Sequence, residues 1–234
     1  MNNWKYDLFT GLGSVVTMQD VLGVATKAAQ ALGFNYCGWI TQLAEPLPKV
    51  ADLCLTSTED PVHEKIRQGR YDRTPARCHC ASNTTPFMWS GSTHDEVFYQ
   101  IPEIAEEYYS YGHRGGWAQS IILDDGLSYV FYTDSCDEIP MHELAQRSPH
   151  LEWVAAAVHA QMLSFRAPAK VRLSLRESDI LRYFGEGLGL KEICSKMKLT
   201  AETVEFHIET ALYKLDIPDI RTAVAQASFM GILR

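Results

Sequence analysis

The stretch LTAETVEFHIETALYKL, Leu199–Leu215, decides how the last part of the chain is interpreted. Thr200 is a suitable N-cap, because its hydroxyl can accept a hydrogen bond from a backbone N–H of the first helical turn. An apolar stripe at helical spacing predicts an amphipathic helix with one buried face. The stripe consists of Val204, Ile208, Ala211, Leu212 and Leu215. The opposite face carries Glu202, Glu205, Phe206, Glu209 and Tyr213.

Three further helical patterns surround this stretch. The segment SLRE, Ser174–Glu177, is a capping box, and the helix that it begins is predicted to stop at Gly187. Residues 190–199 predict a short second helix, and residues 217–233 predict a fourth. A short helix, a tight turn and a longer, half-exposed helix are typical of a helix-turn-helix. A plain four-helix bundle would show the same pattern.

Helices and strands are mixed in the earlier part of the chain. A helix from Thr17 as N-cap to Gly33 as stop precedes two stretches rich in aromatic and β-branched residues, which predict strands. These stretches are 34–43 and 49–57. A second helix at 103–112 precedes a hairpin whose strands are 117–123 and 127–133, with the turn at Asp125–Gly126. A last helix at 141–165 is expected to be interrupted near Pro149.

These patterns predict an α+β chain of two domains. We expect an N-terminal α/β/α sandwich over residues 1–165 and a small all-α domain of four helices, a helix-turn-helix, over residues 173–234. Pro168 breaks the preceding helical pattern among small and basic residues. A linker is therefore predicted at 166–172.

Composition and charge exclude several classes of protein. The chain has 234 residues, is 46% hydrophobic and has a net charge of −8, so it can bury a core and is not disordered. The segment Lys170–Arg234 holds ten basic and nine acidic residues, so the acidity lies in the first part. No apolar run approaches the roughly 20 residues of a membrane span, and we expect no membrane partner. The N-terminus does not resemble a secretory signal. Six cysteines are too few for a disulfide framework and favour a cytoplasmic location.

The segment from Leu173 onward closely resembles the DNA-binding domain of LuxR-type quorum-sensing regulators. The motifs LSLRE, KEI, TVEFH and TAVAQA, together with Gly187, follow the family's order and spacing. The first part resembles the matching autoinducer-binding domain through LGFNYCGWI, TPFMW and YGHRGGW. The resemblance implies that a small hydrophobic signal, usually an acyl-homoserine lactone, binds the first domain. It also implies that a homodimer then binds a palindromic promoter, with no cofactor besides the signal.

The acidic face of the predicted recognition helix departs from the family, in which positions matching Glu205 and Glu209 commonly carry basic or polar residues. A glutamate can accept a hydrogen bond from cytosine N4, whereas three of them weaken attraction to phosphates. A solvated face on a weak DNA binder is the alternative. Besides Glu205 and Glu209, the residues expected to contact DNA are Arg176, Lys191, Lys196, Lys198, Thr200, Thr203, His207 and Lys214. The dimer seam is expected on the last helix, at Ile220, Val224, Ala227 and Ile232.

The signal pocket also departs from the family pattern. The family places an Asp-Pro pair fourteen residues before a pocket tryptophan, and counting back from Trp89 reaches Pro75, preceded by Thr74. Thr74 therefore replaces the aspartate that accepts the ligand's amide N–H, unless Asp72 serves instead. The ordinary lactone is in doubt, because a buried donor without an acceptor costs about 1–3 kcal/mol. The residues predicted to line the pocket are Trp89, Tyr71, Asp72, Thr74, Gly116, Trp117 and Tyr132. Ordinary core aromatics remain the alternative for each tryptophan.

Other constellations carry little weight. The segment RCHC, Arg77–Cys80, lacks a second ligand pair at zinc spacing, so no metal is expected. No arrangement of catalytic residue types rises above chance, and we expect no enzyme. The leading hypothesis is a ligand-responsive transcription regulator. The alternative is an antagonist that does not bind DNA and forms heterodimers with a related regulator.

Overall fold

The computed structural model describes residues 3–43, 53–58, 61–123, 127–165 and 173–233. The chain divides into two compact units, of which the larger comprises Met1–Gln42 and Cys54–Phe165. The smaller unit contains the chain from Arg166 onward. The predicted linker at 166–172 and the predicted turn at Asp125–Gly126 lie outside the described residues.

A five-stranded sheet forms the centre of the larger unit, in the order β2-β1-β5-β4-β3. The strands are β1 (Tyr36–Leu43), β2 (Cys54–Thr56), β3 (Phe87–Trp89), β4 (Gly116–Ile122) and β5 (Leu127–Asp134). The pairs β1–β2, β3–β4 and β4–β5 are antiparallel. The predicted hairpin is confirmed, with Gly116 opposite Asp134 and Ile122 opposite Ser128.

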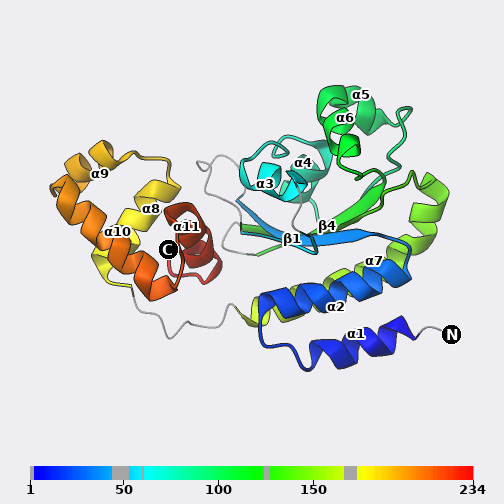
Figure 1. The fold of residues 1–234 in the computed structure, drawn as a ribbon, viewed down its shortest axis with the longest axis horizontal. Helices are drawn as coiled ribbons and strands as arrows, with labels where there is room; N and C mark the ends of the chain where they lie inside the picture. The colour runs from blue at the N-terminus through cyan, green and yellow to red at the C-terminus, as the bar shows by residue number, and fades with distance from the viewer. Residues whose placement is uncertain (1–2, 44–52, 59–60, 124–126, 166–172, 234) are drawn as a thin grey trace. The chain divides into compact units, whose positions relative to one another are not determined.

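Helices cover both faces of this sheet, which confirms the predicted sandwich (Figure 1). One face is covered by α2 (Met18–Ala31) and α7 (Met141–Ser164), and α1 (Trp4–Leu12) packs on the outer side of α2. The other face is covered by short helices. These are α3 (Pro61–Arg67), α4 (Pro75–Ser82), α5 (Glu96–Gln100) and α6 (Pro102–Ser110).

Local chemistry sets the ends of the predicted helices. The Thr17 hydroxyl accepts a hydrogen bond from the backbone N–H of Asp20, and the Asp20 carboxylate accepts one from the N–H of Thr17. This reciprocal pair is a capping box and begins α2 where the sequence predicts. Gly33 and Gly112, with φ of +87° and +82°, follow the ends of α2 and α6. Glycine is favoured there because it has no Cβ to clash in the left-handed region.

The expected interruption near Pro149 is absent, since α7 runs from Met141 to Ser164 with Pro149 inside it. A proline removes one helical hydrogen bond. Here both halves of the helix are held by burial against the rest of the unit, with Leu144 before the proline and Val154 after it fully buried. Tertiary packing therefore outweighs the local cost.

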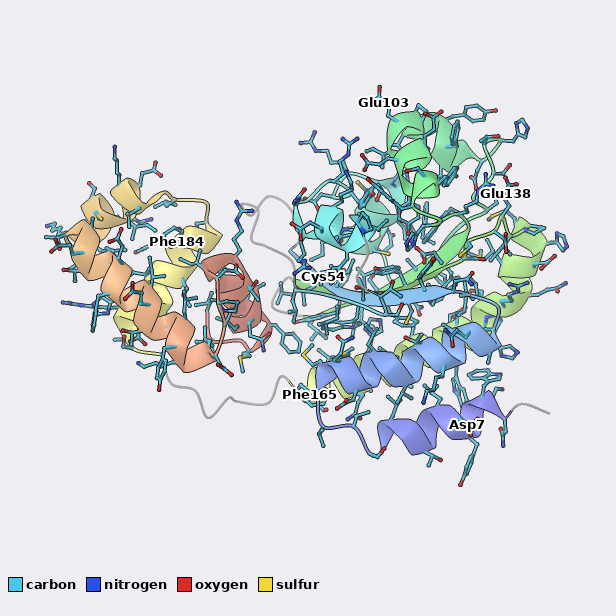
Figure 2. All side chains as sticks on the ribbon, in the orientation of Figure 1. Asp7, Cys54, Glu103, Glu138, Phe165 and Phe184 are labelled. Carbon is cyan, nitrogen blue, oxygen red and sulfur yellow. The ribbon has the colours of Figure 1, made fainter. Side chains whose placement is uncertain are left out.

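The described residues 173–233 form helices joined by turns, as predicted. Its helices are α8 (Leu175–Gly185), α9 (Leu190–Met197), α10 (Ala201–Leu215) and α11 (Ile220–Phe229). Ser174 and Glu177 form the predicted capping box of α8. Phe184, labelled in Figure 2, packs against both apolar clusters that join the helices.

Two of the four residues predicted for a dimer seam on the last helix are buried inside the unit, and a seam at the other two stays a prediction. Val224 and Ala227 are buried in a cluster with Leu181 and Ala211 of the same unit. Ile220 and Ile232 are partly buried and pack against that cluster. These apolar side chains complete the domain's own core, which is a use that helical periodicity alone cannot distinguish from an interface.

Candidate functional site

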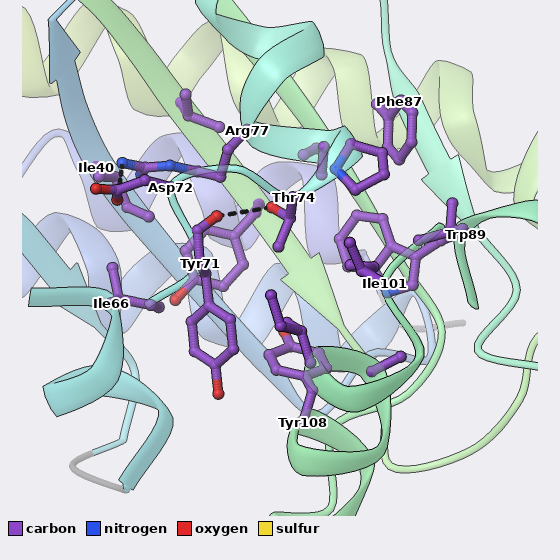
Figure 3. Close-up of a pocket in the computed structure, with 18 of the residues that line it drawn as sticks. Ile40, Ile66, Tyr71, Asp72, Thr74, Arg77, Phe87, Trp89, Ile101 and Tyr108 are labelled. Carbon is purple, nitrogen blue, oxygen red and sulfur yellow. Dashed lines mark hydrogen bonds and ion pairs between the residues drawn. The ribbon is translucent and has the colours of Figure 1, made fainter. Parts of the chain in front are cut away.

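A cavity of about 120 Å³ lies between the sheet and the short helices of the larger unit. Its wall is almost entirely apolar and aromatic (Figure 3). The sheet contributes Ile40, Phe87, Trp89, Ala118, Val130 and Tyr132. The helices and loops contribute Ile66, Tyr71, Asp72, Thr74, Pro75, Ala76, Arg77, Val97, Ile101, Ile104, Ala105, Tyr108 and Tyr109. An apolar cavity with a few placed polar groups is the usual form of a small-molecule site.

Strand alternation decides which sheet residues reach this cavity. Successive side chains of a strand point to opposite faces. Ala118 of β4 and Val130 of β5 line the cavity. Trp117 and Tyr129, one position earlier on the same strands, are fully buried on the face that α7 covers. The two faces of one sheet thus have different uses.

The structure brings together most of the residues predicted for the pocket. Tyr71, Asp72, Thr74, Trp89 and Tyr132 all line the cavity. They come from the loop before α4, from β3 and from β5, and Figure 3 shows Tyr71, Thr74 and Trp89 arranged around one space. A ligand role for each of them stays a prediction.

Trp117 does not lie with them, which corrects the expectation that it lines the same cavity. Its indole Nε1–H donates to the Ser148 hydroxyl of α7 at 2.9 Å, and its side chain is fully buried. Gly116, the other predicted residue of this strand, is paired with Trp89. A Cβ at Gly116 would collide with the Trp89 ring, so this glycine makes room for the ring and does not itself line the cavity.

Thr74 and Asp72, the two candidate acceptors, both have partners within the chain. The Thr74 hydroxyl donates to the backbone carbonyl of Tyr71 at 2.9 Å, and Thr74 precedes Pro75 as the N-cap of α4. A hydroxyl that donates can still accept through its lone pairs. The Asp72 carboxylate accepts from Arg77 at 3.5 Å. Either residue can therefore accept a bond from a ligand, Thr74 as a neutral group and Asp72 as a charged one.

Two tyrosine hydroxyls at the cavity are held by carboxylates. Tyr71 donates to Glu107 of α6 at 3.2 Å, and Tyr108 donates to the buried Asp134. Burial, together with the neighbouring carboxylate, raises the pKa of both Tyr71 and Tyr108. The Asp134 carboxylate also lies 3.0 Å from Nδ1 of His113. Both phenols therefore stay protonated, and their O–H groups point to internal acceptors.

The indole N–H of Trp89 is likewise engaged, because it donates to the backbone carbonyl of Arg114 at 2.6 Å. This bond fixes the ring across the cavity wall and leaves the ring face as the surface for an apolar ligand. Arg77, Tyr108 and Ile101 also line the cavity but were not among the predicted residues. In the sequence, these residues show only a spacing compatible with a helix, and core residues show the same spacing.

The RCHC segment forms part of α4 and does not gather ligands. Cys80 is buried at the cavity side, whereas Cys78 is exposed. His79 lies 2.9 Å from the carbonyl of Thr85. Among the residues that the structure describes, no group of three or more His, Cys, Asp or Glu side chains could hold a metal ion. All six cysteines are free thiols.

In the smaller unit, α10 presents the predicted acidic face to solvent. Glu202, Glu205 and Glu209 are exposed, and Phe206 and Tyr213 are 63% and 87% exposed. The opposite side of the helix is buried at Val204 and Ala211. Thr200 caps the helix as predicted, because its hydroxyl accepts from the N–H of Thr203 at 3.3 Å.

Lys214 is already bound within the unit. Its ammonium donates to both carboxylate oxygens of Glu177, at 2.9 and 2.8 Å. Burial opposes ionisation of Glu177, but hydrogen bonds from Lys214 and Ser174 outweigh it and lower the pKa of this carboxyl. A phosphate contact by Lys214 would compete with this pair.

The remaining predicted phosphate contacts lie around the start of α10 and on α8 and α9. Arg176, Lys191 and Lys198 are exposed. Lys196 lies 3.7 Å from Glu186 and over the ring of Tyr183. Lys198, with φ of +55°, forms the left-handed end of α9 in the turn before α10. His207 is half-buried beside Phe206.

The described helices include none long and apolar enough to cross a membrane.

Comparison with known families identifies both units. A family described as bacterial regulatory proteins, luxR family, matches residues 171–227. A family described as autoinducer binding domain matches residues 17–162. A transcriptional activator protein AnoR from Acinetobacter nosocomialis is 25% identical over the full length of both chains.

Two solved structures have the same fold. SdiA of Escherichia coli matches with a TM-score of 0.54 at 19% identity, covering 99% of this chain and 98% of that one. CepR2 of Burkholderia cenocepacia, described as an N-acylhomoserine-lactone-dependent LuxR family transcription factor, matches with a TM-score of 0.58 at 19% identity. That match covers 68% of this chain and 92% of CepR2.

Proposed function

Because the chain belongs to the luxR family of bacterial regulatory proteins and carries an autoinducer-binding domain, we propose that it binds promoter DNA as a dimer under the control of a small, mainly apolar signal. It is a transcriptional regulator of the quorum-sensing type, with one domain for each task. One observation carries the proposal. The same chain has an apolar cavity in its sandwich domain and, in its helix-turn-helix, the helix α10 with one face exposed to solvent.

The cavity favours a signal that differs from an ordinary acyl-homoserine lactone. Thr74 stands where the family has an aspartate, and a neutral acceptor makes a hydrogen bond roughly half as strong as a charged one. The aromatic walls provided by Tyr71, Trp89 and Tyr108 favour an apolar body. The signal is therefore held mainly by burial, with few polar contacts.

DNA binding is expected to be weak and sensitive to salt. Glu202, Glu205 and Glu209 repel phosphates, while the exposed Arg176, Lys191 and Lys198 attract them. Two-fold operators are matched by two-fold proteins, which supports a dimer. The same three glutamates support a second candidate function, an antagonist that does not bind DNA and pairs with a related regulator.

A gel-shift titration against a randomised duplex pool at two salt concentrations tests these functions. The variant Glu205→Gln/Glu209→Gln removes two exposed negative charges from α10 and keeps helix propensity similar. We expect it to raise affinity about tenfold on all sequences if the glutamates only oppose phosphates. If one of them accepts from a cytosine, the variant instead relaxes preference at one base pair, by about 1–3 kcal/mol.

The matched control is Glu103→Gln/Glu106→Gln, which removes the same charge from exposed positions of α6 in the other unit. It should bind DNA like the unmodified protein. Absence of any shift for the unmodified chain and for the α10 variant at about 50 mM salt, where non-specific binding is favoured, would contradict DNA binding. Co-purification of a related regulator would then support the antagonist.

A further inference from the structure

The wall of the cavity in the larger unit is rich in aromatic rings. Among the described residues that line it, six are aromatic. They are Phe87 and Trp89 of β3, Tyr132 of β5, Tyr71 of the segment before α4, and Tyr108 and Tyr109 of α6. Figure 3 shows Tyr71, Trp89 and Tyr108 around one space. The rings belong to both the sheet and the helical layer, so an occupant meets aromatic surface on more than one side.

On the sheet side, two of these rings lie against glycines. A Cβ at Gly116 would collide with the Trp89 ring, and one at Gly38 would collide with the Tyr132 ring. Because these positions carry no side chain, the rings lie against the backbone and leave the space in front of them open. The hydrogen bond from the Trp89 indole N–H to the carbonyl of Arg114, at 2.6 Å, also holds that ring in place.

On the helical side, Tyr71 and Tyr108 pack edge to face. Their ring centroids are 5.6 Å apart and their planes form an angle of 78°. The Tyr71 hydroxyl donates to Glu107 and the Tyr108 hydroxyl donates to Asp134, so both rings are fixed at their polar ends. A surface whose orientation is fixed before binding loses little conformational freedom when a ligand arrives. The aromatic wall is therefore preorganised.

The size of the cavity suits a small occupant. Its volume is about 120 Å³, and an engineered apolar cavity of about 150 Å³ holds a benzene molecule. The space therefore matches one benzene-sized ring, whereas a long acyl chain needs more room. A planar ring also gains most from this wall, because offset-stacked and edge-to-face ring pairs are favourable beyond the burial of their area.

We propose that the buried part of the signal is a single aromatic ring, which stacks on Trp89 and lies between it and the pair Tyr71 and Tyr108, where the family's usual signal places an acyl chain. Thr74 lines the same cavity and can accept a hydrogen bond from a polar substituent of that ring. This inference rests on the proposed signal-binding role and names the chemical class of the signal.

Isothermal titration of the full chain with methyl benzoate, methyl cyclohexanecarboxylate and methyl heptanoate tests the proposal. The three esters have the same numbers of carbon and oxygen atoms, and they differ in having a planar aromatic ring, a saturated ring or an open chain. We expect methyl benzoate to bind about fivefold more tightly than the saturated ring, because only the benzoate forms ring pairs with the wall. Methyl heptanoate should bind about tenfold more weakly than methyl benzoate, because its chain loses torsional freedom on binding.

Variants at Trp89 locate the effect. Trp89→Leu keeps an apolar side chain but removes the ring, and it should abolish the preference for methyl benzoate over the saturated ester. Trp89→Phe should keep part of that preference. The matched control is Trp153→Leu, which removes a 45% exposed tryptophan of α7, the helix on the other face of the sheet. It should leave all three affinities unchanged.

Binding of none of the esters, binding of methyl benzoate no tighter than either of the others, or an unchanged preference in Trp89→Leu would each overturn the proposal. If circular dichroism shows that Trp89→Leu is unfolded, Trp89→Phe decides. A purely structural role of Trp89 predicts that all three esters lose affinity alike in that variant, whereas stacking predicts a selective loss for methyl benzoate. The gel shift on DNA reads out the regulatory function independently, so a failed ligand class and a failed regulator are distinguishable.

Discussion

The two faces of the β4–β5 hairpin bear similar aromatic and apolar side chains, but one face is tightly packed and the other borders a cavity. On one face, Trp117 and Tyr129 pack without residual exposure against the side covered by α7. On the other face, Val130 and Tyr132 border a cavity. The difference shows that hydrophobicity alone does not separate core from binding site. What separates them is whether the opposing layer fills the space.

Truncating one tryptophan on each face gives the largest expected contrast. Trp117→Ala should lower the free energy of unfolding by about 3–5 kcal/mol, because it empties a fully packed site and leaves the Ser148 hydroxyl without its donor. Trp89→Ala should cost less, because Trp89 is half-buried and already borders open space. Urea unfolding of the full chain measures both. Equal losses would mean that the cavity face is packed core.

A buried histidine makes the packed face sensitive to acid. Nδ1 of His159 on α7 accepts from the Trp39 indole N–H at 3.1 Å, and burial lowers the pKa of His159 from 6.5 to about 4. A protonated imidazole has no lone pair for that bond. The unfolded chain takes up a proton below pH 6.5 while the folded chain resists, so stability falls as pH drops from 6.5 towards 4.

The contribution of His159 is about 2 kcal/mol of lost stability at pH 5 relative to pH 7.5. Urea unfolding at the two pH values should show this loss in the unmodified protein. His159→Gln, which does not titrate in this range, should lose about 2 kcal/mol less between the same pH values. A variant with the same pH dependence as the unmodified protein would show that other groups control acid stability.

The cavity face should respond to a smaller change in chemistry. Thr74→Asp places a charged acceptor at the N-terminus of α4, where a carboxylate is also favourable for the helix. Octanoyl-homoserine lactone should then bind about fivefold more tightly, because its amide N–H meets an ionised acceptor. Titration calorimetry measures the change, and Thr74→Asn is the neutral control. Tight binding by the unmodified chain, indifferent to residue 74, would show that this residue does not contact the amide.

Local signals in the sequence were sufficient for much of the fold. Helix ends depend on residues that are close in sequence, so they can be predicted without knowledge of tertiary contacts. Examples are the capping residues Thr17 and Ser174 and the stops at Gly33 and Gly112. The short helices α3, α4 and α5 and strand β3 were not predicted. They are too brief for periodicity to accumulate, and the packing around the cavity holds them.

The candidate site was predictable only in part, for reasons of geometry. Alternation along β4 puts Trp117 on the opposite face from Gly116 and Ala118, but the sequence does not say which face is hollow. Arg77 belongs to the short helix α4, where no pattern separates an inward arginine from an exposed one such as Arg73. The exposed acidic face of α10 was predicted correctly, because helical spacing separates its two sides.

Two glycines of the sheet determine how easily the shape of this cavity can change during evolution. A methyl group at Gly38 would collide with the Tyr132 ring, as one at Gly116 would with the Trp89 ring. A glycine codon becomes an alanine codon by a single base change. One nucleotide substitution at either position would therefore tilt an aromatic wall and leave every contact residue in place. The range of molecules that fit the cavity can thus change during evolution while the residues that line it stay the same. Sequence comparisons restricted to the lining residues would miss such a change.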